Sequence, residues 1–506
     1  MHAYAEILYK YNYIMSVTMD PEKIMKIPPL LHAYTDDIIR WAIRTFKSKD
    51  ISISRLKQWK KKYPIIYPWD PEYNTERLGY NRIIQVYPLA IVMAKRKRDI
   101  QWALKKAIEL KITFSLKNGG HDHTGACLCD GFIINVSNRD KILVDSKHRY
   151  VKIGCGVVLG ELDLELANKD CSWIPHGTCA NVSCLSLSLS AGIGALTRKY
   201  GLTIDHLLGA TVILADGSIV TANEKENADL FWMLRGCGTS TVGIVTDIKL
   251  KIHKSQEVVL FELKYNTEQL SKVLQMWDNF GPYTENNLAS KILFFPNSNT
   301  SVDFHVCLKG QYEGTVSQLN TLLKDFISFA LCVNIWTATP IDAAIFYNQG
   351  SAEPPWYFFY ETLFTVEPMN DKTIQVLCDF SKSADIEYSV VLNALGGKMA
   401  EVSNEETAFP WRNAKLWIHI MSETRDQRKH AEMEKCVKYL YHGLLDSGLR
   451  NDETGVGRLY INFKDLDLTK DQYPLAYWGN NYQKILEIKH KYDPNNIFRP
   501  IHGVLG

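Results

Sequence analysis

The sequence has few cysteines for its length, no long apolar run and almost no net charge, and each absence excludes a class of protein. Eleven cysteines in 506 residues are too sparse for a disulfide framework, and their odd number leaves at least one unpaired. No window approaches the roughly 18 uncharged apolar residues of a membrane span. A net charge of +2 gives no reason to expect nucleic acid or an anionic membrane as partner. We therefore expect a small-molecule substrate and mostly reduced, buried cysteines.

The N-terminal segment also lacks the features of a secretory signal. Residues 1–17 contain no basic region followed by an uninterrupted apolar stretch and a small-residue cleavage site. We expect a cytoplasmic location by default, and the sequons at Asn135, Asn181 and Asn299 are then chance matches. The 46% hydrophobic and 23% charged residues are typical of a globular protein, and the length predicts two or three domains.

The order of apolar residues predicts an α+β protein whose first half is built from short elements. Apolar residues at helical spacing between Pro21 and about Lys62 predict one or two amphipathic helices. Downstream, the pattern predicts strands at 90–92, 112–115, 133–136, 150–153 and 210–214, and helices at 99–110 and 229–234. The strand, helix and strand between 90 and 115 lead into a glycine-rich loop.

The second half changes in pattern after His253. Longer runs of alternating apolar and polar residues predict strands at 258–263, 292–295, 358–364 and 416–421, with helical segments between them. This order is typical of an antiparallel sheet with one face covered by helices. A last helix is predicted at 485–490, before an Asp-Pro stop at 493–494.

Three segments rich in small residues, at 118–125, 175–194 and 236–245, carry the candidate chemistry. Such loops let backbone N–H groups converge on a phosphate or pack closely on a flat ligand. The first is neither a Walker loop nor GxGxxG, which argues against a nicotinamide dehydrogenase. His123 with Cys127 and Cys129 matches no zinc module, so no metal site is predicted.

The chain resembles the berberine-bridge-enzyme-like flavin oxidases of the vanillyl-alcohol-oxidase superfamily in the order and spacing of several segments, namely 88–122, 175–205, 229–245, 396–410, 460–465, 477–479 and 493–498. The resemblance spans about residues 65 to 506. It implies a two-lobed, PCMH-type FAD-binding domain plus a substrate domain with an antiparallel sheet covered by helices. The expected divisions are a helical extension at 1–64, the FAD domain at 65–253, the substrate domain at 254–458, and a C-terminal segment at 459–506 that returns to the FAD domain.

The resemblance also implies the cofactor site. FAD would be bonded covalently to His121 of the Gly-Gly-His motif and to Cys179 of the Pro-x-Gly-x-Cys motif, two bonds that raise the potential of the flavin. The other residues that the resemblance assigns to the cofactor are Lys117, Asn118, Gly119, Gly120, Asp122, Gly177, Val182, Ser183, Gly192, Gly238, Gly243, Val245 and Asn462.

The chain departs from the family pattern where the catalytic base is expected. The tyrosine of the Asn-Tyr pair is Phe463, and the glutamate that other relatives carry after the Phe-Pro motif aligns with Ile418. Tyr460 is then the predicted base, with Trp417 and His419 as further candidates. Strand alternation places His419 on the face opposite Ile418, which predicts a structural hydrogen-bonding role for this histidine.

Two functions are compatible with these features. The first is an FAD-dependent oxidase that transfers a hydride from a small alcohol or carbohydrate to the flavin, with O2 as acceptor and H2O2 as product. The second, motivated by the missing bases, is an inactive flavoprotein with a structural or assembly role, for example in a virus particle. With either function, the protein could form a homo-oligomer.

Overall fold

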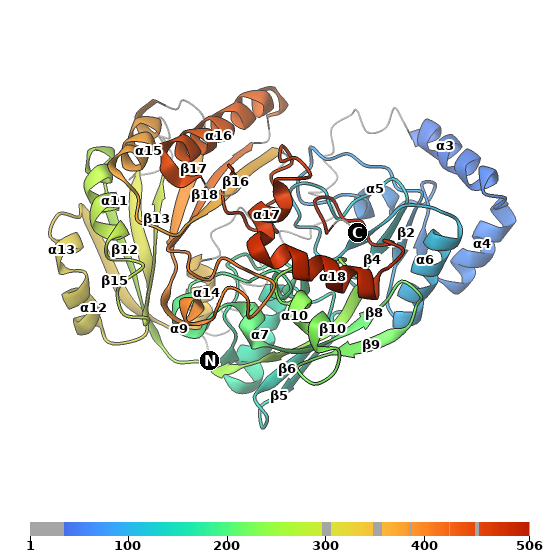
Figure 1. The fold of residues 1–506 in the computed structure, drawn as a ribbon, viewed down its shortest axis with the longest axis horizontal. Coiled ribbons are helices and arrows are strands. Elements are labelled where there is room, and N and C mark those ends of the chain that lie inside the picture. The colour runs from blue at the N-terminus through green and yellow to red at the C-terminus, as the bar shows by residue number, and fades with distance from the viewer. Residues whose placement is uncertain are drawn as a thin grey trace.

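The computed structural model describes residues 35–295, 305–347, 357–383, 387–424, 426–450 and 455–504. Figure 1 shows two lobes side by side, one built from the first half of the chain and one from a single large sheet with helices on its outer face. The predicted α+β class is confirmed. Asn299 and the part of the first predicted helical segment before residue 35 lie outside the described residues. The domain boundaries stay predictions.

The first lobe contains a small sheet with three parallel strands and one short antiparallel strand at its edge. Its order is β1 (Ile65–Ile66), β2 (Ala90–Met93), β4 (Phe132–Asn135) and β3 (Phe114–Lys117). The crossover helix α6 (Lys97–Glu109) packs on this sheet through Ile100, Ala103 and Leu104. The carboxylate of Asp99 accepts the backbone N–H groups of Lys95 and Arg96, which fixes the start of the helix. The strand, helix and strand predicted here are confirmed, the second strand beginning two residues later.

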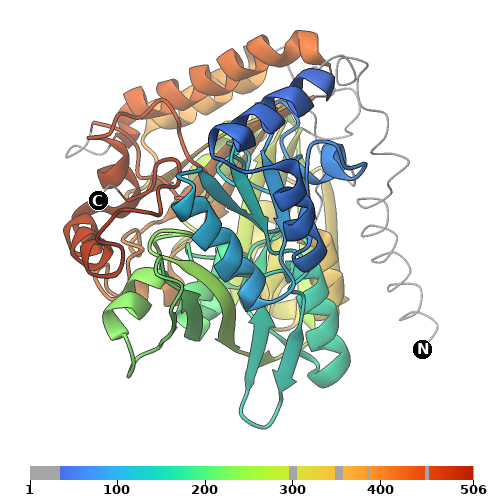
Figure 2. The same ribbon diagram turned by 90° about the vertical axis from the view of Figure 1, so that its right-hand side faces the viewer.

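Two helices before this sheet cover its outer side, as Figure 2 shows. These are α3 (Thr35–Ser48) and α4 (Ile53–Lys62), followed by the short α5 (Tyr73–Glu76). Each has a buried apolar stripe, with Phe46 on α3 and Leu56 on α4 fully buried. The basic run at 57–62 lies mostly on the exposed side of α4. The predicted amphipathic helices are confirmed for the described residues.

The second sheet of this lobe is antiparallel and has five strands. Its order is β5 (Ile142–Asp145), β6 (Tyr150–Gly154), β10 (Ile244–Lys251), β8 (Leu207–Ile213) and β9 (Ile219–Ala222). The helices between these strands are α7 (Leu159–Asp170), α8 (Cys184–Ser188), α9 (Thr197–Tyr200) and α10 (Ala228–Leu234). A two-stranded ribbon of β7 (Ser172–Trp173) and β11 (His253–Lys254) leads to the second lobe.

The second lobe is one seven-stranded antiparallel sheet. Its order is β15 (Cys332–Ala338), β12 (Val258–Tyr265), β14 (Val306–Tyr312), β13 (Leu288–Phe294), β17 (Ser389–Ala394), β18 (Leu416–Thr424) and β16 (Tyr357–Thr365). Figure 1 shows α11 (Leu270–Asp278), α15 (Asp371–Ser383) and α16 (His430–Leu444) over its outer face. The remaining helices of the lobe are α12 (Val316–Leu322), α13 (Lys324–Ile327) and α14 (Pro340–Tyr347). The predicted helix-covered antiparallel sheet is confirmed.

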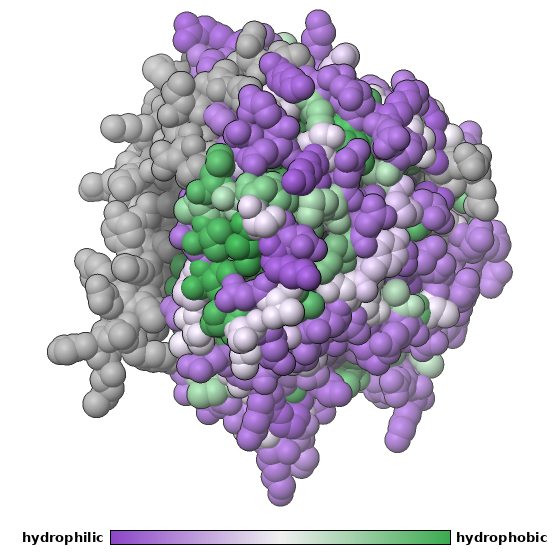
Figure 3. Space-filling view, turned by 90° about the vertical axis from the view of Figure 1, so that its left-hand side faces the viewer, coloured by the Kyte–Doolittle hydropathy of each residue, from purple (hydrophilic) through white to green (hydrophobic). Residues whose placement is uncertain are grey.

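The edge strand β15 carries exposed apolar side chains. Val333 and Trp336 are 41% and 38% exposed, and Leu331, just before the strand, is 56% exposed. Figure 3 views the molecule from this side and shows a green patch among mostly polar surface. An apolar edge strand is a surface on which chains can pair. The homo-oligomer stays a prediction.

The C-terminal segment returns to the first lobe through α17 (Tyr473–Trp478) and α18 (Tyr482–Tyr492), and Figure 1 shows α18 beside α10. The ammonium of Lys489 is fully buried, 2.6 Å from the Asp493 carboxylate and 2.9 Å from the carbonyl of Thr241. The Asp493 carboxylate also accepts the backbone N–H groups of Ile497 and Phe498. The Asp-Pro motif therefore ends the last helix and fastens the segment to the loop before β10.

Candidate active site

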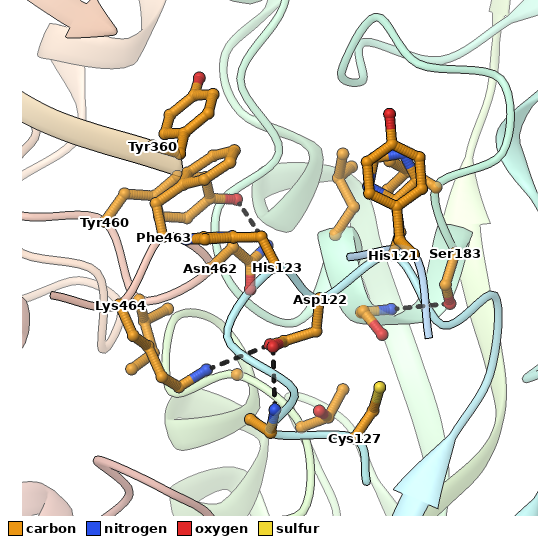
Figure 4. A pocket seen from close by; sticks show the side chains of 18 of the residues that line it. His121, Asp122, His123, Cys127, Ser183, Tyr360, Tyr460, Asn462, Phe463 and Lys464 are labelled. Atoms are coloured by element: carbon orange, nitrogen blue, oxygen red, sulfur yellow. Dashed lines mark hydrogen bonds and ion pairs between the residues drawn. The ribbon is translucent and has the colours of Figure 1, made fainter. Parts of the chain in front are cut away.

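A cavity of about 1290 Å³ lies between the seven-stranded sheet and the small-residue loops of the first lobe. The sheet meets it with the face opposite to the one that the helices cover, and we call this the cavity face. This volume is above the roughly 300–1000 Å³ of a pocket for one drug-sized ligand. All three loops that the sequence singled out contribute to its lining, together with residues 460–464. The topology thus brings motifs that are far apart in the sequence to one place (Figure 4).

The loop after β3 forms one wall of the cavity. The side-chain amide of Asn118 donates to the Cys155 carbonyl and to the Ser183 hydroxyl. A Cβ at Gly119 would lie 2.9 Å from the carbonyl oxygen of Asn181, so a larger residue would push the two loops apart. Gly120 has φ +68°, a conformation that favours glycine. The two glycines therefore let this loop turn sharply against the second loop.

Asp122 fixes the end of the same loop. Its Oδ1 accepts the backbone N–H groups of Thr124 and Ala126, at 3.0 and 2.9 Å. Its Oδ2 lies 3.7 Å from Nζ of Lys464, which comes from the C-terminal segment (Figure 4). Burial would raise the pKa of this carboxyl, but Lys464 and the hydrogen bonds lower it overall. Asp122 is therefore a carboxylate that connects two segments of the site.

His121 lines the cavity and stacks on the ring of Tyr80, with 4.0 Å between the ring centroids and 21° between their planes. Burial lowers the pKa of His121 to about 4, although Asp122 opposes the shift. The imidazole is therefore neutral at physiological pH, with a nitrogen lone pair available for a bond. Tyr80 was not predicted as a site residue, because nothing in the sequence around it marks it as part of the cavity.

Cys179 lines the same cavity from the second loop. Burial raises the pKa of its thiol, so it is uncharged at rest. The loop is held from behind by His176, whose Nε2 lies 2.7 Å from the Asp163 carboxylate and whose Nδ1 lies 2.6 Å from the Gly177 carbonyl. A Cβ at Gly194 would lie 1.8 Å from the His176 carbonyl oxygen, so only glycine fits there.

Tyr460 and Asn462 line the cavity, but their polar groups serve each other and the second loop. The Tyr460 hydroxyl oxygen accepts the Gly192 N–H at 3.1 Å and the Asn462 amide N–H at 3.2 Å. The Asn462 carbonyl oxygen accepts the Ser190 hydroxyl at 2.7 Å. Burial raises the pKa of Tyr460, against the lowering effect of these hydrogen bonds. The role of Tyr460 as base stays a prediction.

A second phenol stands beside the position where the family base is missing. Tyr360 of β16 stacks on Phe463, with ring centroids 4.4 Å apart and planes 13° apart (Figure 4). Its hydroxyl forms a hydrogen bond with Nδ1 of His419 on β18. Both residues line the cavity. Tyr360 was not predicted as a site residue, because strand alternation does not show which strands of the sheet lie next to the loops of the first lobe.

His419 lies on the side of β18 that meets the cavity. The cavity face of β18 carries Trp417, His419 and Met421. Ile418 and Ile420 are fully buried and point to the opposite face, which α16 covers. The predicted alternation is confirmed, and it places Ile418, the position aligned with the family glutamate, on the face away from the cavity. A base at position 418 could not reach the cavity.

Most of the expected cofactor residues line the cavity: Asn118, Gly119, Gly120, His121, Asp122, Gly177, Cys179, Val182, Ser183, Gly238 and Asn462. Four expected residues are not part of the lining: Lys117, Gly192, Gly243 and Val245. The Lys117 ammonium instead donates to the carbonyls of Glu76 and Leu78, each at 2.7 Å. Gly243 packs against the backbone of Ile213, and Val245 pairs with Val212 in the sheet. These residues support the loops from outside.

The described part of the chain contains no group of three His, Cys, Asp or Glu side chains that could hold a metal ion. It also contains no helix long and apolar enough to cross a membrane.

Two family profiles match the chain: the FAD binding domain at residues 88–223, and the berberine and berberine-like family at residues 459–504. An FAD-linked oxidoreductase of Bacillus subtilis, YgaK, is 30% identical over 85% of this chain and 94% of its own length. The chain belongs to the berberine-bridge-enzyme-like FAD-linked oxidoreductases. The glucooligosaccharide oxidase of Sarocladium strictum is 27% identical to this oxidoreductase over 85% of the chain and 90% of the relative.

Solved structures share the fold of this FAD-linked oxidoreductase. A chitooligosaccharide oxidase structure superposes with a TM-score of 0.78 at 22% identity, covering 88% of this chain and 97% of the other. A structure of the Acremonium strictum glucooligosaccharide oxidase, described as revealing a novel flavinylation, has the same TM-score at 24% identity, covering 88% of this chain and 96% of the other. The comparisons lend no support to the alternative of an inactive assembly protein.

Proposed function

We propose that this FAD-linked oxidoreductase oxidises a hydroxyl group of a carbohydrate or a similar small alcohol, with O2 as final acceptor and H2O2 as product. The observation that carries the proposal is that His121 and Cys179, from separate loops, line one cavity together with a hydrogen-bonded phenol and imidazole. Relatives named as glucooligosaccharide, chitooligosaccharide and carbohydrate oxidases support this substrate class.

The residues present fit a large cofactor with polar and flat parts. Asn118 Oδ1 and Ser240 Oγ line the cavity, are buried and have no hydrogen-bond partner among the described residues. The glycines at 119 and 194 have no side chain to fill the space between the loops, which leaves room for a planar ring. His121 and Cys179 are the two positions for covalent bonds, as the description of a 6-S-cysteinyl, 8α-N1-histidyl FAD in glucooligosaccharide oxidase supports. When bound, the flavin accepts a hydride from a C–H bond and is re-oxidised by O2.

His121 and Cys179 differ in how readily each can form a bond to the flavin. The imidazole has a free lone pair without first losing a proton, because its pKa is about 4. The thiol must lose its proton to react, since the thiolate is the nucleophile. We infer that His121 forms its bond more readily than Cys179, and that Cys179→Ala alone leaves the cofactor attached.

The proton of the substrate hydroxyl needs an acceptor in the cavity. Tyr460 has two donors directed at its oxygen, so it holds the second loop and has little capacity to accept a further proton. The hydroxyl of Tyr360 can pass its own proton to Nδ1 of His419 while its oxygen accepts the substrate proton. We therefore favour Tyr360, with His419 behind it, over Tyr460 as the base.

Anaerobic bleaching of the flavin by a panel of sugars and alcohols tests the proposal. A substrate should bleach the flavin without O2, and admitting O2 should restore the yellow colour and yield H2O2. Absence of bleaching across neutral and acidic mono- and oligosaccharides and aromatic alcohols would refute it. Stable self-assembly together with that result would favour the assembly protein instead.

A further inference from the structure

Three hydrogen-bond donors on the sheet wall of the cavity have no acceptor among the described residues. Trp417 Nε1 and His419 Nε2 of β18 are both buried without a partner. Lys291 of β13 forms neither an ion pair nor a hydrogen bond with a described side chain, and the ionisable groups that shift its pKa are another lysine and two thiols. All three side chains line the cavity. Buried polar groups are normally paired, so these donors need an explanation.

The strand register brings these donors together in one patch. Lys291 stands directly opposite Asn393, and Asn393 stands directly opposite Trp417. Residues opposite each other in a sheet share a face, and neighbouring strands are about 4.8 Å apart, so the row spans roughly 10 Å. The ring of His419 lies 3.7 Å from that of Trp417. We call Lys291, Trp417 and His419 the donor patch.

Among the residues that the structure describes, no carboxylate forms an ion pair with Lys291. On its other side, Lys309 of β14 stands directly opposite it, and like charges in that position destabilise a sheet. Lys309 has Glu262 to offset its charge. Lys291 instead faces the Cys179 and Cys307 thiols and, at 5.1 Å, the ring of Tyr347. Burial, followed by Lys309, lowers the pKa of Lys291 to about 8, so it remains mostly cationic at pH 7.

The other two members of the patch can only donate as well. The indole N–H of tryptophan has no acceptor function. Nδ1 of His419 faces the Tyr360 hydroxyl, and when that hydroxyl donates, the ring proton is on Nε2. Burial and then Lys291 hold the pKa of His419 well below its usual value, so the ring is neutral. The patch therefore offers one positive charge and two N–H groups.

We propose that the donor patch binds a carboxylate of the substrate, so that the enzyme acts on an acidic sugar of the uronic type, or a related hydroxy acid, in preference to a neutral one. This inference rests on the proposed function and specifies its substrate. A neutral sugar would leave this half-buried ammonium in the cavity wall without a partner. A phosphate dianion would bring a second negative charge that a single lysine does not balance.

The proposal connects substrate recognition to the proton acceptor. A carboxylate bound at Nε2 of His419 would favour the protonated imidazole and oppose the effects of burial and Lys291. The substrate O–H bond would break with its proton passing to the Tyr360 oxygen, while the Tyr360 proton moves to His419 Nδ1. The C–H bond of the carbon that bears this hydroxyl would break with its hydride passing to the FAD of the proposed function, which leaves a carbonyl group. His419 would thus be a better acceptor when the acidic substrate is bound than in the free enzyme.

Binding to the purified flavoprotein tests the proposal without requiring turnover. Flavin difference spectra would be titrated with two matched pairs, glucuronate against glucose and galacturonate against galactose. We expect each acid to bind roughly ten- to hundred-fold more tightly than its neutral partner, the effect of a hydrogen bond to a charged group. The advantage should fall as the pH rises through about 8, because Lys291 then loses its proton.

Lys291→Met should abolish the preference for the acid, and Lys291→Gln should reduce it to a few-fold. Lys324→Met removes the same charge from an exposed site on α13 and should leave the preference unchanged. Because methionine relieves the repulsion from Lys309, Lys291→Met is expected to unfold at the same or a higher temperature than the wild type.

Equal binding of acid and neutral sugar, or a preference that survives Lys291→Met, would overturn the inference while leaving the oxidase function intact. Tighter binding of glucose 6-phosphate than of glucuronate would overturn the choice of a carboxylate. Binding of acids without any bleaching would support the donor patch and refute the oxidase. If no sugar binds and none bleaches the flavin, both proposals fail.

Discussion

Replacing Tyr360 by phenylalanine separates the two candidate bases. The substitution removes one oxygen and leaves the aromatic stack on Phe463, at 4.4 Å, and the contact with Phe358. The fold of the site should therefore be unchanged. His419 Nδ1 loses its only described hydrogen-bond partner, and the cavity loses a phenol that is hydrogen-bonded to an imidazole.

The expected loss follows from the role of a general base. Such a group contributes about 10²- to 10⁴-fold to the rate, and at 1.36 kcal/mol per factor of ten this corresponds to about 3–5 kcal/mol of transition-state stabilisation. Tyr460→Phe removes the acceptor of two neutral hydrogen bonds, each worth about 0.5–1.5 kcal/mol to stability. We expect Tyr460→Phe to lower the unfolding midpoint while its rate of flavin reduction stays within about ten-fold of wild type.

The assay is anaerobic stopped-flow reduction of the flavin at saturating substrate, with each variant first shown to contain the wild-type amount of flavin. The variant with the slower flavin reduction identifies the residue that acts as the base. If Tyr460→Phe slows reduction more than Tyr360→Phe does, our assignment of the base is refuted and the original prediction of Tyr460 is restored.

Two further predictions concern stability. Lys489→Met leaves the fully buried Asp493 carboxylate without its cation, and we expect a loss of about 3–5 kcal/mol, seen as a lower urea midpoint, whereas no loss would show that the pair does not anchor the C-terminal segment. Burial alone would lower the pKa of His176, but Asp163 and the Gly177 carbonyl raise it overall. Its stabilisation is therefore complete below the unfolded pKa of about 6.5 and is lost as the pH rises through the higher folded value. Unfolding midpoints measured from pH 5 to 9 should show this decline, and His176→Gln should remove it.

Much of the site could be predicted because its motifs are local. The loop at 118–122 and the cysteine at 179 are marked by glycines that a sharp turn or a close backbone approach requires, and such requirements are visible in a single sequence. The helix-covered sheet was predictable from strands that combine an apolar run with alternation, as in Val258–Tyr265, whose last five residues alternate.

The sheet wall of the cavity could not be predicted in the same way. Alternation separates His419 from Ile418, but both faces of β18 are largely apolar, so the pattern does not show which one meets the cavity. The order β13, β17, β18 and β16 pairs strands that are distant in the chain. The juxtaposition of Lys291 with Trp417 therefore depends on long-range register, for which the sequence contains no local signal.

The intact mass of the acid-denatured protein shows whether FAD is bonded covalently to His121 and Cys179. We predict that the wild type carries the added mass of one FAD, that Cys179→Ala and His121→Ala each still carry it, and that the double variant does not. Cys127→Ala removes another thiol of the cavity lining and should behave as the wild type. A wild-type mass equal to that of the bare chain would show that neither bond forms, and FAD retained by the double variant would show that another residue holds it.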